Sequence, residues 1–398
     1  MCGIVGAVAQ RNVVPILIEG LRKLEYRGYD SAGIAIMNGQ MSRVRAVGRV
    51  AELEHRAKEA HADAPTGIAH TRWATHGGVT ENNAHPHISN GKGIEVSVVH
   101  NGIIENHEAL RARLKAQGYE FQSDTDTEVI AHLVHSLVAS GKTLMQAVQQ
   151  AVRELHGAYA IAAISKTEPN TVVGSRRGSP LLLGVGNAGS GQGENFLASD
   201  TSALLQVTKY VAYLDEGDVV EIRLDGYSIV DAEGNPAERP IVESQLSADA
   251  IELGNYDHYM QKEIFEQPGA IANTLEMVAN ASSLSSGLFG ADAEAIFART
   301  KQILILACGT SWHAGSVAKY WLEAVAGIPT SVEIASEYRY RESVALPGTL
   351  VLTISQSGET ADTIAALQHA QGLGLRDTLT ICNVPESALI RQSKLRFL

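Results

Sequence analysis

The sequence has few cysteines, fewer basic than acidic residues and no long hydrophobic run, and each shortage disfavours a class of protein. Its 398 residues include three cysteines, Cys2, Cys308 and Cys382. An odd number of widely spaced cysteines does not make a disulfide framework and is typical of the reducing cytosol. The 44 acidic residues outnumber the 32 Lys and Arg, which gives a net charge of -12. We therefore expect neither a nucleic acid nor an anionic membrane as partner, because both would be repelled.

No stretch reaches the roughly 18 consecutive apolar residues that a membrane span needs. The opening run MCGIVGAVAQ has no basic residue ahead of it and ends at Gln10 and Arg11, so it does not match a signal peptide. The remaining composition, 45% hydrophobic and 19% charged, is that of ordinary globular proteins. We predict a cytoplasmic protein of two domains, because the chain is too long for one compact core.

Short strand patterns with a few helical ones between them fill residues 1–240 and predict a layered α/β domain. The strand patterns cover residues 4–9, 33–37, 67–74, 94–102, 159–165, 218–223 and 227–231. Helical spacing covers residues 14–24, 106–118 and 126–141. The glycine-rich stretch 186–195 lacks the strand-to-helix context of a phosphate loop, so we predict a surface loop there.

A different organisation is predicted after residue 240. A polar stretch with prolines ends the first domain, and residues 241–300 form a linker and a helical lead-in with helical spacing from Tyr256. From residue 301 to 398, apolar strands run into Ser, Thr and Gly loops, each followed by helix-forming residues. This alternation predicts βαβ units around a parallel sheet.

Cys2 directly follows the initiator methionine, which is usually removed ahead of a small residue. Its α-amine would then be free, with a reference pKa of about 7.7 to 8.0 against about 8.5 for the thiol. Such an amine takes the thiol proton directly or through one water, so nucleophile and base belong to one residue. Taken alone, Cys2 also fits a small hydrophobic residue at the start of a strand.

Three polar clusters follow at predicted strand ends, where loops place chemistry. HTRWATHG contains Arg72, whose planar guanidinium suits a carboxylate. VVHNG places the side-chain amide of Asn101 beside the backbone N–H of Gly102, and two such donors make an oxyanion hole. SDTDTEV puts Asp126 at a helix start, where an N-cap is the alternative interpretation.

The histidines near these clusters also raise the alternative of a metal site. No HExxH motif and no Cys/His spacing supports it, so we expect neither a metal nor a cofactor. The histidines concerned are His70, His76, His85, His87 and His100.

These residues resemble the class II glutamine amidotransferases, which are N-terminal-nucleophile hydrolases. The resemblance rests on ordered blocks across residues 1–240: MCGIVGAV, EYRGYDSAG, HTRWATHG, NAHPH, VVHNGIIENH and SDTDTEV. It implies a four-layer αββα sandwich, with Cys2 as nucleophile and its α-amine as base. It also implies that Asn101 and Gly102 form the oxyanion hole.

The same resemblance implies how L-glutamine is held. Arg72 would bind its carboxylate and Asp126 its ammonium. Trp73 is similar to a residue that gates the passage of ammonia, and ordinary core packing is the alternative for it. The remaining residues that would line or support the pocket are Thr75, His76, Gly77 and His85.

The second half is similar to family members that transfer glutamine nitrogen to fructose 6-phosphate, giving glucosamine 6-phosphate and glutamate. The blocks are HYMQKEIFEQP, LACGTSWHAG, IASEYRYR and SQSGETADT, and the implied acceptor half consists of sugar isomerase (SIS) domains. A Ser/Thr/Gly loop at a helix N-terminus presents hydroxyls and N–H groups to a phosphate, although either loop alone also fits plain helix capping. The candidates are Gly309, Thr310 and Ser311 in one loop and Ser355, Gln356, Ser357 and Thr360 in the other.

The end of the chain departs from this pattern. The resemblance places the ring-opening and isomerising groups in a second SIS domain, whereas the chain stops at Leu398 behind RQSKLRFL, which also drifts from the family pattern. We expect a truncated or frame-shifted product with an incomplete SIS domain that keeps glutaminase activity and makes no glucosamine 6-phosphate. Relatives form homodimers, and the sequence leaves the oligomeric state of this chain open.

Two other functions stay open at this point. A different class II amidotransferase, such as an amidophosphoribosyltransferase or an asparagine synthetase, needs a pyrophosphate-binding acidic motif or an SGGxD-type ATP loop, and the sequence has neither. A sugar-phosphate sensor without catalysis would be favoured by an inert N-terminus.

Overall fold

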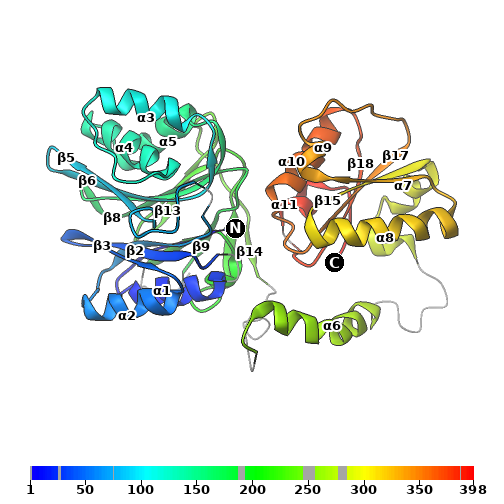
Figure 1. Ribbon diagram of the computed structural model, residues 1–398, viewed down its shortest axis with the longest axis horizontal. Coiled ribbons are helices and arrows are strands. Elements are labelled where there is room, and N and C mark those ends of the chain that lie inside the picture. The colour runs from blue at the N-terminus through cyan, green and yellow to red at the C-terminus, as the bar shows by residue number, and fades with distance from the viewer. Residues whose placement is uncertain are drawn as a thin grey trace. The chain divides into compact units, whose positions relative to one another are not determined.

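The computed structural model divides the chain into two compact units, Met1–Tyr259 and Met260–Leu398. The boundary falls inside the segment 241–300 that the sequence predicts as a linker and helical lead-in. Two stacked sheets build the first unit and one parallel sheet builds the second (Figure 1). The described residues are 2–25, 28–74, 76–186, 193–244, 256–276, 285–385 and 387–398.

The first unit contains an antiparallel sheet of eight strands and one of six. In spatial order, the first consists of β14 (Ile241–Glu243), β11 (Tyr210–Tyr213), β9 (Leu182–Val185), β10 (Glu194–Ala198), β1 (Gly3–Ala9), β4 (Thr66–Arg72), β2 (Ser31–Asn38) and β3 (Gln40–Val47). The second consists of β13 (Tyr227–Val230), β12 (Val219–Ile222), β8 (Glu168–Arg177), β7 (Gly157–Ser165), β6 (Ile94–Ile104) and β5 (His87–Gly91).

Helices cover the outer face of each sheet, which completes a four-layer αββα sandwich (Figure 1). The first sheet carries α1 (Val14–Leu24) and α2 (Val50–Glu59), and the short η2 (Thr201–Ala203) lies against α1. The second carries α3 (His107–Ala116), α4 (Asp126–Ala139) and α5 (Leu144–Glu154). The predicted N-terminal-nucleophile architecture is confirmed.

Strand β1 shows why the layers form. Val5 and Ala7 belong to the core that includes α1, whereas Ile4 and Val8 belong to the core between the two sheets. Successive side chains of a strand point to opposite faces, so a strand buried on both faces needs an unbroken apolar run. That is the pattern IVGAVA of the sequence.

The sequence patterns miss half of the described strands of the sandwich. The missed strands are β3, β5, β8, β9, β10, β11 and β14. The predicted surface loop 186–195 lies between β9 and β10 except for Glu194 and Asn195, which belong to β10, and residues 187–192 lie outside the described residues. The predicted strand 67–74 ends at Arg72, so the next residues belong to the loop that follows β4.

The second unit is a five-stranded parallel sheet with helices on both faces. In spatial order, its strands are β16 (Thr330–Ile334), β15 (Gln302–Ala307), β17 (Thr349–Ser355), β18 (Asp377–Cys382) and β19 (Leu395–Phe397). Its helices are α6 (Tyr259–Glu276), η4 (Ser286–Phe289), α7 (Ala293–Arg299), α8 (Gly309–Ala326), α9 (Ala335–Tyr338), α10 (Ala361–Gly372) and α11 (Ala388–Gln392). The predicted parallel sheet is confirmed.

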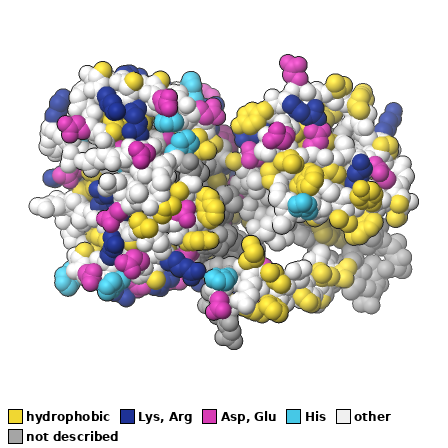
Figure 2. All heavy atoms as spheres, viewed as in Figure 1, with side chains coloured by type: hydrophobic (Ala, Val, Ile, Leu, Met, Phe, Trp, Pro, Cys, Tyr) yellow, Lys and Arg dark blue, Asp and Glu magenta, His cyan; other side chains and the backbone are white. Residues whose placement is uncertain are grey.

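Helix α8 exposes apolar side chains on its outward face. Tyr320, Trp321 and Val325 are 71%, 67% and 87% exposed. Figure 2 shows apolar side chains grouped on this face of the unit and along α6. A contiguous exposed apolar surface of this kind is typical of an interaction site. Among the described residues, no helix has the length and apolar character needed to cross a membrane.

Candidate active site

The pairing of β1 with β4 brings Cys2 beside the end of β4. Gly3 lies opposite Thr71 in the register of the two strands, so Cys2 reaches Trp73. The backbone N–H of Trp73 donates to Cys2 Sγ over 3.2 Å. Burial raises the pKa of the Cys2 thiol, and the hydrogen bond from Trp73 only partly offsets this. The folded state therefore favours the protonated thiol over the thiolate.

The Asn101 amide is aimed at Cys2 from the second sheet. Its Nδ2 donates to the backbone carbonyl of Cys2 at 3.1 Å, and its Oδ1 lies 2.9 Å from His70 Nε2. The same His70 nitrogen lies 3.0 Å from the carbonyl oxygen of His100.

Burial lowers the pKa of His70 to about 3, so its ring is neutral at physiological pH. A neutral ring carries one N–H, and two acceptors at Nε2 assign the proton to that nitrogen. His70 thereby fixes which end of the Asn101 amide faces the backbone carbonyl of Cys2.

Gly102, the other predicted oxyanion donor, occupies a position that only glycine fits. Its φ is 132°, and a Cβ there would lie 2.0 Å from the carbonyl oxygen of Ala158. The absence of a side chain lets β6 pass this close to β7 while Gly102 lines the cavity at Cys2.

One narrow cavity brings the predicted nucleophile and the predicted glutamine clamp together. It is lined by Cys2, Arg72, Trp73, His76, His85, His100, Gly102, Thr125, Asp126 and Thr127. Asp126 Oδ2 accepts the backbone N–H of Ile104 at 2.9 Å. Thr125 is the N-cap residue of α4 and Asp126 its first helical residue, so the interpretation of Asp126 as an N-cap is wrong.

The Arg72 guanidinium binds the loop that follows β4. It donates to the carbonyl oxygens of Gly78 and Gly77, each over 3.2 Å, and to that of His76. The cation therefore holds the pocket loop in place while it lines the cavity. Gly77 has a φ of 78°, and a Cβ there would lie 2.7 Å from Asn83 Nδ2.

The other predicted pocket residues differ in their surroundings. The ring of His76 packs edge to face on His107, with centroids 5.2 Å apart. The ring of His85 packs on that of His70 at 4.2 Å, and burial holds its pKa well below the usual value. Trp73 is 46% exposed, so core packing does not account for it. Thr75 lies outside the described residues.

The buried histidines were also the basis of the metal alternative. Across the described ranges, no three His, Cys, Asp or Glu residues form a group that could hold a metal ion.

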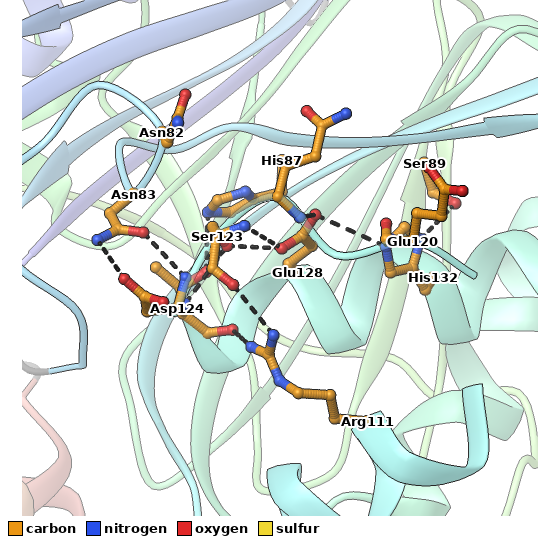
Figure 3. Close-up of polar contacts among 12 residues, drawn as sticks. Asn82, Asn83, His87, Ser89, Arg111, Glu120, Ser123, Asp124, Glu128 and His132 are labelled. Atoms are coloured by element: carbon orange, nitrogen blue, oxygen red, sulfur yellow. Dashed lines mark hydrogen bonds and ion pairs between the residues drawn. The ribbon is translucent and has the colours of Figure 1, made fainter. Parts of the chain in front are cut away.

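Sequence patterns missed the network that holds the loop ahead of α4 (Figure 3). Glu128 accepts the backbone N–H groups of Gln122 and Ser123 at 2.8 and 2.7 Å. Burial opposes ionisation of this carboxyl, but hydrogen bonds from His132 and from the loop outweigh it and lower the pKa below its usual value. From α3, Arg111 donates to the carbonyl oxygens of Ser123 and Thr125 at 3.0 and 2.7 Å.

The two candidate phosphate loops of the second unit follow neighbouring parallel strands. β15 pairs with β17, so their carboxyl ends share one edge of the sheet. Helix α10 follows β17 and packs on one face, whereas α8 follows β15 and packs on the other. This is the switch point at which open α/β sheets bind their ligands.

Within these loops, the hydroxyls have distinct environments. Ser355 Oγ accepts the Gly358 N–H at 3.0 Å, and Ser357 Oγ accepts the Glu359 N–H at 3.2 Å, so both shape the turn. Gln356 is exposed beside them. The N-cap residues of α8 and α10 are Cys308 and Thr360, and neither side chain makes a capping hydrogen bond. Gly309, Thr310 and Ser311 form the first turn of α8.

Comparison with known proteins matches both halves of the chain. A family model described as a glutamine amidotransferase domain matches residues 70–206, and one described as a SIS domain matches residues 296–398. The glutamine–fructose-6-phosphate aminotransferase (isomerizing) of Xylella fastidiosa strain 9a5c is 56% identical over 396 residues, covering 99% of this chain and 64% of the relative. The chain is similar to aminotransferases of this name along nearly its whole length.

A second relative shows the same extent of similarity. The aminotransferase of the same name from Pseudomonas aeruginosa is 53% identical over 400 residues, which cover all of this chain and 64% of the relative. The chain thus spans 64% of the length of these curated relatives.

One solved structure shares the fold along most of the chain. It is glutamine phosphoribosylpyrophosphate amidotransferase from B. subtilis, complexed with ADP and GMP. The TM-score is 0.52 at 19% identity, and the match covers 96% of this chain and 81% of that one. At this identity the likeness concerns the fold alone.

We expect the free energy of unfolding of this chain to fall as the pH is lowered below 6.5, the ordinary pKa of histidine. The folded state keeps His70 neutral to about pH 3, whereas the unfolded chain protonates it, so acid favours unfolding. One such group changes stability by about 1.4 kcal/mol per pH unit between these values. Denaturant unfolding at several pH values measures the slope.

His70→Gln should reduce that slope by the contribution of one bound proton, about 1.4 kcal/mol per pH unit, because the variant has no imidazole to protonate at this position. His55→Gln is the matched control, since it removes a histidine whose side chain is exposed. Equal slopes for His70→Gln and the unmodified chain would contradict the assignment.

Proposed function

We propose that this chain hydrolyses L-glutamine with Cys2 as nucleophile and that the ammonia released aminates fructose 6-phosphate. The observation that carries the first half is a single cavity. Into it open the Cys2 thiol, the oxyanion position Gly102 and the two charged groups Arg72 and Asp126. The names of the relatives support the second half.

The hydrolysis begins at Cys2 once Met1 is removed. The α-amine takes the thiol proton, and Sγ attacks the side-chain amide carbon of glutamine to form a tetrahedral intermediate. The negative oxygen accepts hydrogen bonds from the Asn101 amide and the Gly102 N–H. When the C–N bond breaks, the ammonium returns the proton to the leaving nitrogen, which departs as ammonia. Water then hydrolyses the thioester and releases glutamate.

The two charged groups at the cavity recognise the α-amino acid end of glutamine. Arg72 binds the carboxylate and Asp126 binds the ammonium, which matches each charge to its opposite. The carbonyl oxygens of His76 and Gly77 accept hydrogen bonds from Arg72 and hold its guanidinium in place. The ring of His85 packs against the ring of His70. Exposed Trp73, which lines the cavity beside Cys2, gates the passage of the released ammonia.

The acceptor half binds the phosphate of fructose 6-phosphate at the switch point of the second unit. Two helix N-termini meet there, and their N–H groups and hydroxyls attract an anion. Gly309, Thr310 and Ser311 contribute from one loop, and Ser355, Gln356, Ser357 and Thr360 from the other.

Two finer points belong to the same proposal. The exposed apolar face of α8 supports assembly into a homodimer, which would bury it. The cytoplasmic location is supported by the sparse cysteines of the sequence.

The test of the nucleophile is removal of the thiol or of the free amine. Cys2→Ala should abolish glutamine hydrolysis, measured as glutamate and ammonia released. A form with an uncleaved N-terminal tag should be equally inactive, because an amide nitrogen does not accept a proton. The intact mass establishes whether Met1 is absent. A tagged form that hydrolyses glutamine at the untagged rate would show that the amine is not the base.

The oxyanion role predicts a loss in kcat. Asn101→Ala should lower kcat by roughly 10²-fold, because the donor acts on charge that develops only in the transition state. His70→Leu should lower kcat in the same way, since the Asn101 amide then loses the group that orients it. His70→Gln retains a side-chain N–H donor and should recover part of the activity. An unchanged kcat for Asn101→Ala would exclude the oxyanion role.

A further inference from the structure

Asn83 is a buried amide between the two loops of the proposed glutamine clamp. It is 2% exposed and lies outside the residues that line the cavity. Its Nδ2 donates to the Gly78 carbonyl oxygen at 3.1 Å and lies 3.4 Å from Asp124 Oδ2. Its Oδ1 accepts the Asp124 backbone N–H at 3.0 Å. Figure 3 shows Asn83 facing Asp124.

Each of these two loops carries one end of the clamp. Gly78 O also accepts Nη1 of Arg72 at 3.2 Å, so Arg72 and Asn83 share one acceptor. Asp124 precedes Asp126 by two residues, and Asp126 is anchored to Ile104 of β6. A continuous chain of hydrogen bonds therefore runs from the Arg72 guanidinium through Asn83 to the loop of Asp126.

The loop of Asp126 has little freedom to adjust. Arg111 holds the Ser123 and Thr125 carbonyl oxygens from α3, and Glu128 holds the Ser123 N–H from α4. On the other side, Gly77 packs so closely on Asn83 that a Cβ would lie 2.7 Å from Nδ2. Asn83 thus joins an anchored loop to the loop that Arg72 binds.

We propose that Asn83 is a positioning residue that sets the separation between Arg72 and Asp126 and so makes the site selective for an α-amino acid amide. Asn83 touches neither the thiol nor the substrate and acts through the two loops. The proposal rests on the glutaminase function proposed above.

The proposal predicts a defect in binding rather than in chemistry. In Asn83→Ala, the KM for glutamine should rise by about 10-fold or more while kcat stays close to that of the unmodified chain, because the oxyanion donors are unaffected. Glutaramate, which lacks the α-amino group, makes no contact with Asp126. The kcat/KM for glutaramate should therefore fall less than the kcat/KM for glutamine. The ratio of the two values, which measures the preference for glutamine, should shrink by about the factor by which the KM for glutamine rises.

Two further variants control for unfolding and for general effects. Asn82→Ala removes the same kind of side chain from the adjacent, exposed position and should leave KM and the preference unchanged. Asn83→Asp keeps the shape of the side chain but places a carboxylate against that of Asp124. The preference of this variant for glutamine over glutaramate should shrink at least as much as that of Asn83→Ala. Thermal unfolding of each variant verifies that it is folded, and Asn83→Asp provides the test if Asn83→Ala does not fold.

Thiol labelling gives a readout that does not depend on turnover. Iodoacetamide has no α-amino acid group and should alkylate Cys2 of Asn83→Ala at the unmodified rate. A diazoketone analogue of glutamine should inactivate the variant more slowly. An unchanged preference for glutamine, or a loss confined to kcat, would overturn the role of Asn83. An unmodified chain without glutaminase activity would instead overturn the proposed function itself.

Discussion

The burial of β1 on both faces is the constraint on which the site depends. All seven residues from Gly3 to Ala9 are buried, some against α1 and some against the second sheet. A strand held in this way cannot shift by one residue without exchanging its two apolar faces, so its register with β4 is strongly specified. Cys2 is therefore delivered to the end of β4, where Trp73 donates to its sulfur.

Around that fixed cysteine, neutral histidine rings pack beside the charged groups that hold the loops. Burial lowers the pKa of His70, His85 and His100, which favours the neutral form of each ring. His70 and His100 take part in side-chain hydrogen bonds, whereas His85 packs on the ring of His70. Neutral rings avoid the large penalty of burying charge. In the proposed hydrolysis, groups that are positioned before substrate arrives would need little reorganisation when charge develops on the substrate oxygen.

The proposed phosphate site of the second unit uses a different principle. Its parallel strands bring two loops to one sheet edge, with their helices on opposite faces. Backbone N–H groups at helix starts attract a phosphate without a buried cation. The proposed glutamine clamp would instead pair two individual charges, Arg72 and Asp126, with the two ends of a zwitterion.

The sequence by itself determined the fold class of each domain and named most of the candidate site residues. Doubly buried strands are recognisable as apolar runs, as in IVGAVA, and the polar clusters at strand ends supplied Cys2, Arg72, Asn101 and Asp126. Only the tertiary structure decided what orients these residues. His70 reaches Asn101 across 31 residues, and Asn83 reaches Asp124 across 41. Each pair meets only because sheets and loops pack together, and no local periodicity records a contact between side chains so distant along the chain.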